Sequence, residues 1–320
     1  MGGAAVTGSI GVPGDVDMFA LPVVAGREYT VTLKSAPSSG LADPYLVLLS
    51  PTGVALAQDD DSAGALDSRL TFAADSTGNY FVSASDFDVG IGTYAVSVIQ
   101  RNVISGSPGP DSLQGGSGPD SLHGGAGRDS LRGGRGDDWL DGGADIDTVV
   151  YAGLSGAFSL AHGANGWSAF DAVGLDGLDQ LTDVERITFA DLHLALDLDG
   201  HAGLTAKILG AVFGAASVAN REYVAIGLDL LDSGMGYETL MQLAINARLG
   251  AGASHKAVVD LLYTNVVGYA PPKGDEDYFV ALLDSHAFTA ASLGVLAAET
   301  DQNQLNIDLI GLADTGLPFG

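Results

Sequence analysis

Five aspartates recur at nine-residue spacing between residues 106 and 150. The five copies read GSPGPDSLQ, GGSGPDSLH, GGAGRDSLR, GGRGDDWLD and GGADIDTVV, and the sixth position of each is an aspartate: Asp111, Asp120, Asp129, Asp138 and Asp147. Carboxylate oxygens combined with backbone carbonyls are a hard ligand set, which suits Ca²⁺ and would hold zinc poorly. The spacing therefore predicts calcium binding in the turns of a repeated structure.

Glycines precede each aspartate, mostly at the first, second and fourth positions of the repeat. Glycine adopts backbone angles that a Cβ forbids, so these residues can turn successive carbonyls toward one point. The glycines expected to help form the metal sites are Gly106, Gly109, Gly115, Gly116, Gly118, Gly124, Gly125, Gly127, Gly133, Gly134, Gly136 and Gly142. The end copies are irregular, because Ser107 and Pro108 lie in the first turn and Asp145 replaces the fourth glycine of the last. The central copies are therefore the most regular candidate sites.

An apolar residue at the eighth position of each copy indicates how the turns are held. Each copy divides into a six-residue turn and a three-residue strand, and five side chains would stack inward: Leu113, Leu122, Leu131, Leu140 and Val149. The alternative is a glycine-rich disordered linker, but a linker requires neither a fixed period nor a recurring apolar residue. Because the segment buries little and gathers carboxylates, we expect it to be unfolded until calcium binds.

This nonapeptide run resembles the RTX family of secreted bacterial proteins, whose repeat forms a calcium-binding parallel β-helix. The resemblance implies a parallel β-roll in which two strands make one turn, so that sites are shared by aspartates from alternate repeats: Asp111 with Asp129, Asp120 with Asp138, and Asp129 with Asp147. It also implies the type I secretion machinery as a partner, with an uncleaved C-terminal signal. The N-terminal MGGAAVTGSIGVPGDVD shows no Sec-type signal peptide, which fits that route.

Composition excludes several classes of function. The chain has 40 acidic and 13 basic residues, and its net charge of −27 argues against binding nucleic acid or an anionic membrane. It has no cysteine, which excludes disulfides and thiolate chemistry. No stretch reaches the ~18 apolar residues of a membrane-spanning helix. The composition suits a cation-binding protein that is secreted or displayed at the cell surface.

No catalytic signature is present in the sequence. We find no zinc-protease helix motif, serine nucleophile elbow, Walker loop or dinucleotide-binding glycine motif, and none of the six histidines is spaced i, i+4 with another. His123 is expected to be a solvated surface residue, and Trp139 a packing contact rather than a sugar platform. The prediction is that the protein is not an enzyme.

The first hundred residues have the pattern of a β-sandwich. Short apolar runs are divided by turn residues, and YTVTL, RLTFA and TYAVSV alternate as strands do. We expect about seven or eight strands. The runs GDVDMF, DPYLVLLSPTG, DDDSAGALDSRLTF and GNYFVSAS resemble the bacterial pre-peptidase C-terminal domain, a jelly-roll or sandwich module. The resemblance implies a non-catalytic role in processing, secretion or substrate binding.

Acidic residues also cluster at the turns of this first segment. If Asp15, Asp43, Asp60 and Asp67 converge on one edge, they could form a second Ca²⁺ site. The alternative, which we favour, is that they are solvated turn residues that accept hydrogen bonds from backbone amides.

The last 170 residues predict a change from strands to helices. Up to residue 200 the pattern gives further strands, and Val184, Glu185 and Arg186 before an apolar run resemble the segments that close RTX rolls. Such a segment would cover the open end of the stack. From Leu204 the apolar spacing is helical, and we expect five to seven short helices. Their expected starts are Ser217, Ser254 and Thr289, and their expected stops are Gly214, Gly234, Gly250 and Gly268.

Residues 201–320 also resemble an uncharacterised α-helical domain family that often follows RTX repeats, through REYVAIGLDLLDSGM and DYFVALLDSHAFTAASL. The predicted fold is therefore multidomain. An all-β, jelly-roll-like sandwich similar to the pre-peptidase C-terminal domain covers 1–102, and an RTX parallel β-roll covers 103–150. A β cap of the roll covers 151–200. An all-α domain, in which a C-terminal secretion signal could lie, covers 201–320.

The function expected from these features is that of a non-catalytic calcium-binding exoprotein, or the C-terminal region of one. It would be exported by a type I system, fold on extracellular Ca²⁺ and serve secretion, stability and adhesion. Two alternatives stay open. One is a surface-layer or adhesin subunit that binds cell-envelope polysaccharide or other copies of itself. The other is the accessory region of a secreted hydrolase such as a protease.

Overall fold

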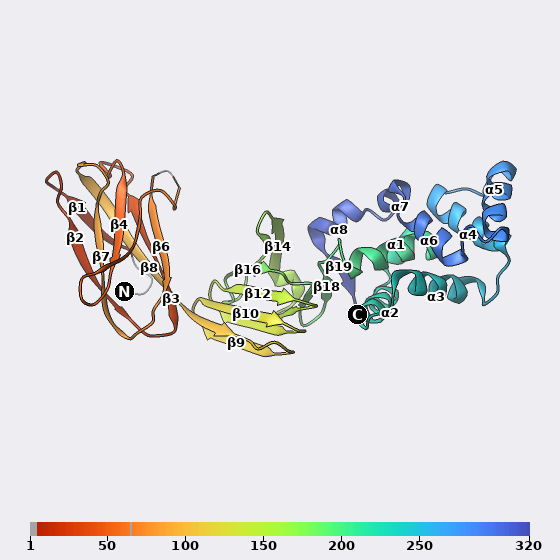
Figure 1. Ribbon diagram of the computed structural model, residues 1–320, viewed down its shortest axis with the longest axis horizontal. Coiled ribbons are helices and arrows are strands. Elements are labelled where there is room, and N and C mark those ends of the chain that lie inside the picture. The colour runs from red at the N-terminus through yellow and green to blue at the C-terminus, as the bar shows by residue number, and fades with distance from the viewer. Residues whose placement is uncertain (1–4, 65) are drawn as a thin grey trace. The chain divides into compact units, whose positions relative to one another are not determined.

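The computed structural model describes residues 5–64 and 66–320 (Figure 1). The chain forms two compact units. One consists of Met1–Ile104, Gly115–Leu122 and Arg135–Asp138, and the other of Ser105–Gln114, His123–Gly134 and Trp139–Gly320. None of the described helices is both long enough and apolar enough to cross a membrane.

The first unit contains two antiparallel sheets that share one hydrophobic core. Its strands are β1 (Val6–Ile10), β2 (Asp17–Val23), β3 (Arg27–Ser35), β4 (Pro44–Leu49), β5 (Ala55–Asp59), β6 (Ser68–Ala73), β7 (Gly78–Asp86) and β8 (Gly92–Ser105). Strands β1, β8, β3 and β6 are neighbours in that order as part of a nine-stranded sheet, and β2, β7, β4 and β5 form a four-stranded sheet in that order. Alternate residues of each strand face inward, as Tyr29, Val31 and Leu33 do in β3. The core they form with Leu46 and Val82 belongs to both sheets.

The repeats form short strands that end in glycine turns. The strands are β9 (Ser112–Ser117), β10 (Asp120–Ala126), β11 (Ser130–Arg135), β12 (Trp139–Ala144) and β13 (Thr148–Val150). Alternate strands are neighbours, and β11 pairs with β13 in parallel, with Leu131 opposite Val149. The eighth-position side chains are all buried: Leu113, Leu122, Leu131, Leu140 and Val149.

The segment after the repeats continues these ladders and adds a hairpin. Its elements are the 3₁₀ helix η1 (Ser155–Ala157) and the strands β14 (Phe158–Gly163), β15 (Gly166–Asp171), β16 (Leu178–Thr182), β17 (Arg186–Thr188) and β18 (His193–Ala195). β16 pairs in parallel with β12, and β17 in parallel with β13. The rings of Tyr151, Phe158 and Phe189 pack together beside them, with centroids 4.6–5.5 Å apart.

The C-terminal segment is mainly helical. It contains α1 (His201–Phe213), the 3₁₀ helix η2 (Ala215–Ala219), α2 (Arg221–Asp232), α3 (Tyr237–Leu249), α4 (His255–Val267), α5 (Lys273–Asp284), α6 (Ala290–Ala298), α7 (Asp301–Asn306) and α8 (Leu309–Thr315). Their inward faces form a core that includes Ile208, Met241, Leu262 and Leu293.

The helix ends agree with the sequence signals at most positions. Ser254 and Thr289 cap α4 and α6 through their side-chain oxygens, and Gly250 ends α3. The prediction of Ser217 as a helix start is wrong: it lies inside η2, and Asn220 caps α2 by accepting from the Tyr223 amide.

The expected range of five to seven helices is also too low, because eight α-helices are present in the described residues. The two short helices α7 and α8 follow one another closely at the end of the segment. A final strand, β19 (Leu317–Phe319), pairs antiparallel with β18, so the segment is not entirely helical. Three residues are too few to give a strand period in the sequence.

Candidate metal centre

The turns of the first, third and fifth repeats place their aspartates in a ladder. The backbone amide of Asp111 donates to Oδ1 of Asp129, and the amide of Asp129 donates to Oδ1 of Asp147, both at 2.8 Å. One rung further, the amide of Asp147 donates to Oε2 of Glu185, again at 2.8 Å. The structure thus brings together aspartates that are 18 residues apart.

The turns of the second and fourth repeats form an equivalent ladder in the other compact unit. The amide of Asp120 donates to Oδ1 of Asp138 at 2.8 Å. At the N-terminal end of this ladder, the side-chain amide of Asn102 donates to Oδ1 of Asp120. Asn102 lies 18 residues before Asp120, so it occupies the place of an earlier repeat. The nine-residue pattern does not reveal Asn102, because an asparagine does not match the aspartate of the repeat.

The second carboxylate oxygens of three of these aspartates are buried. Asp120, Asp129 and Asp147 have exposed fractions of 0–3%. Within the described residues, the Oδ2 atoms of these three have no hydrogen-bond partner. A buried charged oxygen without a partner is costly, so such a group requires a cation or a proton.

The turn glycines have two separate roles. Those at the second and fourth positions have positive φ, as at Gly125 (106°) and Gly127 (109°), and Asp145 takes the same conformation at 81°. The other turn glycines of the repeats with positive φ are Gly116, Gly118, Gly134, Gly136 and Gly143. Gly109, at the fourth position of the irregular first repeat, is not among them.

Glycines at the first position leave space beside two oxygens. A Cβ on Gly124 would lie less than 3 Å from both Oδ2 of Asp129 and the carbonyl oxygen of Gly142. Gly106 has the same relation to Asp111 and Gly124, and Gly142 to Asp147 and Asp183. Gly115 and Gly133 are the first residues of the second and fourth repeats. In the turns of the first, third and fifth repeats, then, a carboxylate and a carbonyl converge on a space that only glycine leaves open.

The electrostatics of the turns favour a bound cation. Burial raises the pKa of Asp138 to about 7, and burial together with the nearby Asp129 charge raises the pKa of Asp147 to about 6. Burial also raises the pKa of Asp120. Since the ionised forms are disfavoured, an added positive charge would stabilise these carboxylates. Buried carboxylates and convergent carbonyls are the oxygen ligands that Ca²⁺ takes, so the residues present fit this ion.

The four turn aspartates of the first segment have other surroundings. Oδ1 of Asp67 accepts from the Ser35 amide at 2.8 Å, and Oδ1 of Asp15 accepts from the Val16 amide at 3.0 Å. Burial and the charges of Asp61 and Asp60 raise the pKa of Asp43. In residues 5–64 and 66–320, no three His, Cys, Asp or Glu residues gather closely enough to hold a metal on their own. A second calcium site built from these aspartates stays a prediction.

Tandem glycine turns, stacked short strands and a ladder of buried carboxylates define a calcium-binding repeat protein. The chain carries four copies of the RTX calcium-binding nonapeptide repeat, in residues 100–118 and 114–149. The matched residues include Asn102 and all five turn aspartates. Comparison with curated proteins gives no match.

Three solved structures are similar to parts of the chain. The pre-peptidase C-terminal domain of collagenase from Bacillus anthracis is 22% identical, over 30% of this chain and 87% of that one, with a TM-score of 0.25. The extracellular lipase LipA from Serratia marcescens is 27% identical over 28% of this chain and 14% of its own, with a TM-score of 0.26. PliG, a periplasmic inhibitor of g-type lysozyme from Aeromonas hydrophila, is 18% identical over 30% of this chain and 84% of its own, with a TM-score of 0.23.

Proposed function

We propose that the protein is a non-catalytic calcium-binding exoprotein whose repeats fold into a parallel β-roll when Ca²⁺ binds. It would leave the cell through a type I secretion system and reach the extracellular space or cell surface, where it would serve adhesion or stability. A jelly-roll-like sandwich precedes the roll in this proposal, and a β cap and a helical domain follow it. Proteins with RTX repeats are generally secreted, which supports this reading.

The observation that carries the proposal is the set of buried, unpartnered oxygens in the turns. Oδ2 of Asp129 and Oδ2 of Asp147 each face a carbonyl across the space left by a first-position glycine. This arrangement supplies negative oxygen ligands and, within the described residues, no basic side chain hydrogen-bonded to those atoms. A bound divalent cation would give these oxygens the partner that they lack.

Calcium would also give export a direction. Ligands gathered from several turns do not exist as a site in the unfolded chain, so the binding free energy is folding free energy. Extracellular modules bind Ca²⁺ with affinities of roughly 10⁻⁴ to 10⁻³ M, which external calcium meets and cytosolic calcium does not. The repeats would stay unfolded during transport and fold outside.

Calorimetric titration of the whole chain with CaCl₂ tests the proposal, together with the variant Asp129→Asn. Asparagine keeps the side-chain shape and can still accept from the Asp111 amide, but it removes the charge. We expect the wild type to bind several ions and Asp129→Asn to bind fewer or more weakly. The matched control Asp75→Asn changes an exposed carboxylate and should behave as the wild type. A wild-type chain that binds no calcium would overturn the proposal.

A further inference from the structure

Strands β16 and β17, which follow the β14–β15 hairpin, extend both stacks, although they carry no repeat sequence. In the parallel pair β12–β16, Leu140 is opposite Leu181, and in β13–β17, Val149 is opposite Ile187. Leu181 and Ile187 are 1% and 0% exposed, like the repeat residues they follow. Residues 178–188 therefore occupy the place of one more rung.

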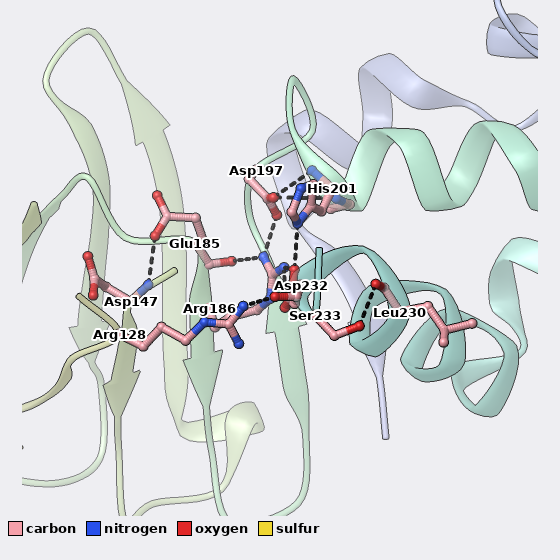
Figure 2. A network of polar contacts seen from close by, with 10 residues as sticks. Arg128, Asp147, Glu185, Arg186, Asp197, His201, Leu230, Asp232 and Ser233 are labelled. Carbon is pink, nitrogen blue, oxygen red and sulfur yellow. Dashed lines mark hydrogen bonds and ion pairs between the residues drawn. The ribbon is translucent and has the colours of Figure 1, made fainter. Parts of the chain in front are cut away.

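Glu185 occupies the position in this rung that an aspartate has in the repeats. Because Arg186 is paired with Thr148, Glu185 lies opposite Asp147. Its Oε2 accepts the Asp147 amide at 2.8 Å, the distance at which Asp129 and Asp147 accept the amides below them. Figure 2 shows the Glu185 carboxylate directed at Asp147.

The turn that carries Glu185 is shorter than a repeat turn. Six residues, 142–147, separate Asp141 from Thr148, whereas three residues, 183–185, separate their partners Thr182 and Arg186. The carbonyl of Asp183 still faces the space beside Gly142, as the Gly142 carbonyl faces the space beside Gly124.

This end of the ladder brings two carboxylates together. Asp147 is 0% exposed and its Oδ2 has no hydrogen-bond partner among the described residues. Glu185 is in no ion pair in the same part of the chain. The guanidinium of the adjacent Arg186 contacts the carboxylates of Asp197 and Asp232 and donates to the backbone carbonyl of Glu185, not to its carboxylate (Figure 2).

We propose that Glu185, together with Asp147 and the carbonyl of Asp183, binds an additional Ca²⁺ at the end of the ladder. The inference rests on the proposed function, because it requires that the repeats bind calcium. The ion would tie the last nonapeptide to the segment that follows it. Beyond Glu185, the Arg186 ion pairs join β17 to the end of α2, and His201 at the start of α1 contacts Asp232 at 2.7 Å. Calcium at this site would order the contact between the repeats and the helices.

The test is calcium stoichiometry by equilibrium dialysis on the whole chain, comparing wild type with Glu185→Gln. Glutamine keeps an oxygen for the Asp147 amide and removes only the charge. We expect one ion fewer, or a weakening of one site beyond the roughly 10- to 100-fold that loss of an outer-shell partner costs. The control Glu222→Gln changes an exposed glutamate of α2 and should bind as the wild type. Unchanged stoichiometry and affinity in Glu185→Gln would overturn the inference.

Asp129→Asn separates this inference from the proposed function. If Asp129→Asn loses calcium and Glu185→Gln does not, the repeats bind calcium and Glu185 does not. If the wild type binds no calcium, the proposed function itself is wrong, and the inference about Glu185 is wrong with it. Should Glu185→Gln not fold, hydrogen exchange of the wild type decides: calcium should protect the amides of 183–188 together with those of the repeats. Protection confined to the repeats would contradict a site at Glu185.

Discussion

The repeat segment, residues 106–150, and the helical segment, residues 201–316, bury different kinds of side chain. Besides its apolar eighth-position residues, the repeat segment buries four aspartates: Asp120, Asp129, Asp138 and Asp147. The helical segment buries many apolar side chains, and its buried polar residues in the described structure are the neutral Thr205 and Asn303. The amide of Asn303 donates to the carbonyls of Lys207 and Ala298.

The difference separates two ways of stabilising a fold. Apolar burial favours folding without any ligand, at roughly 25 cal/mol per Å². Buried carboxylates oppose folding until a partner neutralises them. The helical segment should therefore fold from its own sequence, and the repeat segment only with calcium.

The largest effect is expected from removing one leucine from each core. Leu131→Ala should cost about 2–5 kcal/mol of unfolding free energy, and Leu262→Ala in α4 a similar amount. The Leu131→Ala cost should appear only with calcium, because the metal-free repeats have no fold to lose, whereas the Leu262→Ala cost should persist in EGTA. Denaturant unfolding followed by segment-resolved hydrogen exchange measures both. A Leu131→Ala effect of equal size in EGTA would remove the contrast between the segments.

A smaller effect is expected where a methyl group fills the space meant for the ion. Gly124→Ala places a Cβ against Oδ2 of Asp129 and the Gly142 carbonyl, and such overpacking costs about 1–3 kcal/mol. Calcium affinity should fall with it in the same titration. Gly274→Ala in α5 is the control, since nothing lies within 4 Å of its added methyl group. Wild-type calcium binding by Gly124→Ala would show that the ion does not use this space.

Acidification should act in opposite directions on the two states of the repeats. The pKa of Asp147 is raised to about 6 and that of Asp138 to about 7, so metal-free folding takes up protons. Above these pKa values the buried carboxylates are ionised and destabilise the metal-free fold, and protonation relieves this as the pH falls. In EGTA, the protection of the repeat amides should therefore increase as the pH is lowered from about 8 to about 5. Calcium needs the ionised forms, so its affinity should fall over the same range. An affinity that rises on acidification would contradict this.

The smallest effect is expected at a helix cap that is remote from the metal. Thr289 and Ser292 form a reciprocal capping box at the start of α6. Thr289→Ala should cost about 1 kcal/mol of helical-segment stability. The cost should be the same with calcium and in EGTA, as hydrogen exchange of α6 can measure. A calcium-dependent cost would mean that the helices are coupled to the ion more strongly than separate cores imply.

Sequence reasoning works where one residue type has one physical role. The nine-residue period identifies the apolar stack and the aspartates that the structure brings together, and serine or threonine before a helix identifies the caps at Ser254 and Thr289. It does not find Asn102 or the role of Glu185, because their register depends on strand pairing and not on composition. Nor does it find β19, which exists through pairing with the distant β18.

The identity of the metal ligands stays a prediction. The most direct test of the central claim, that calcium folds the repeats, is hydrogen exchange of the whole chain, measured segment by segment in calcium and in EGTA. The account predicts that chelation removes protection from residues 106–150 and leaves the helices from α1 to α6 protected. Equal protection of the repeat amides in EGTA and in calcium would contradict the claim that calcium folds the repeats.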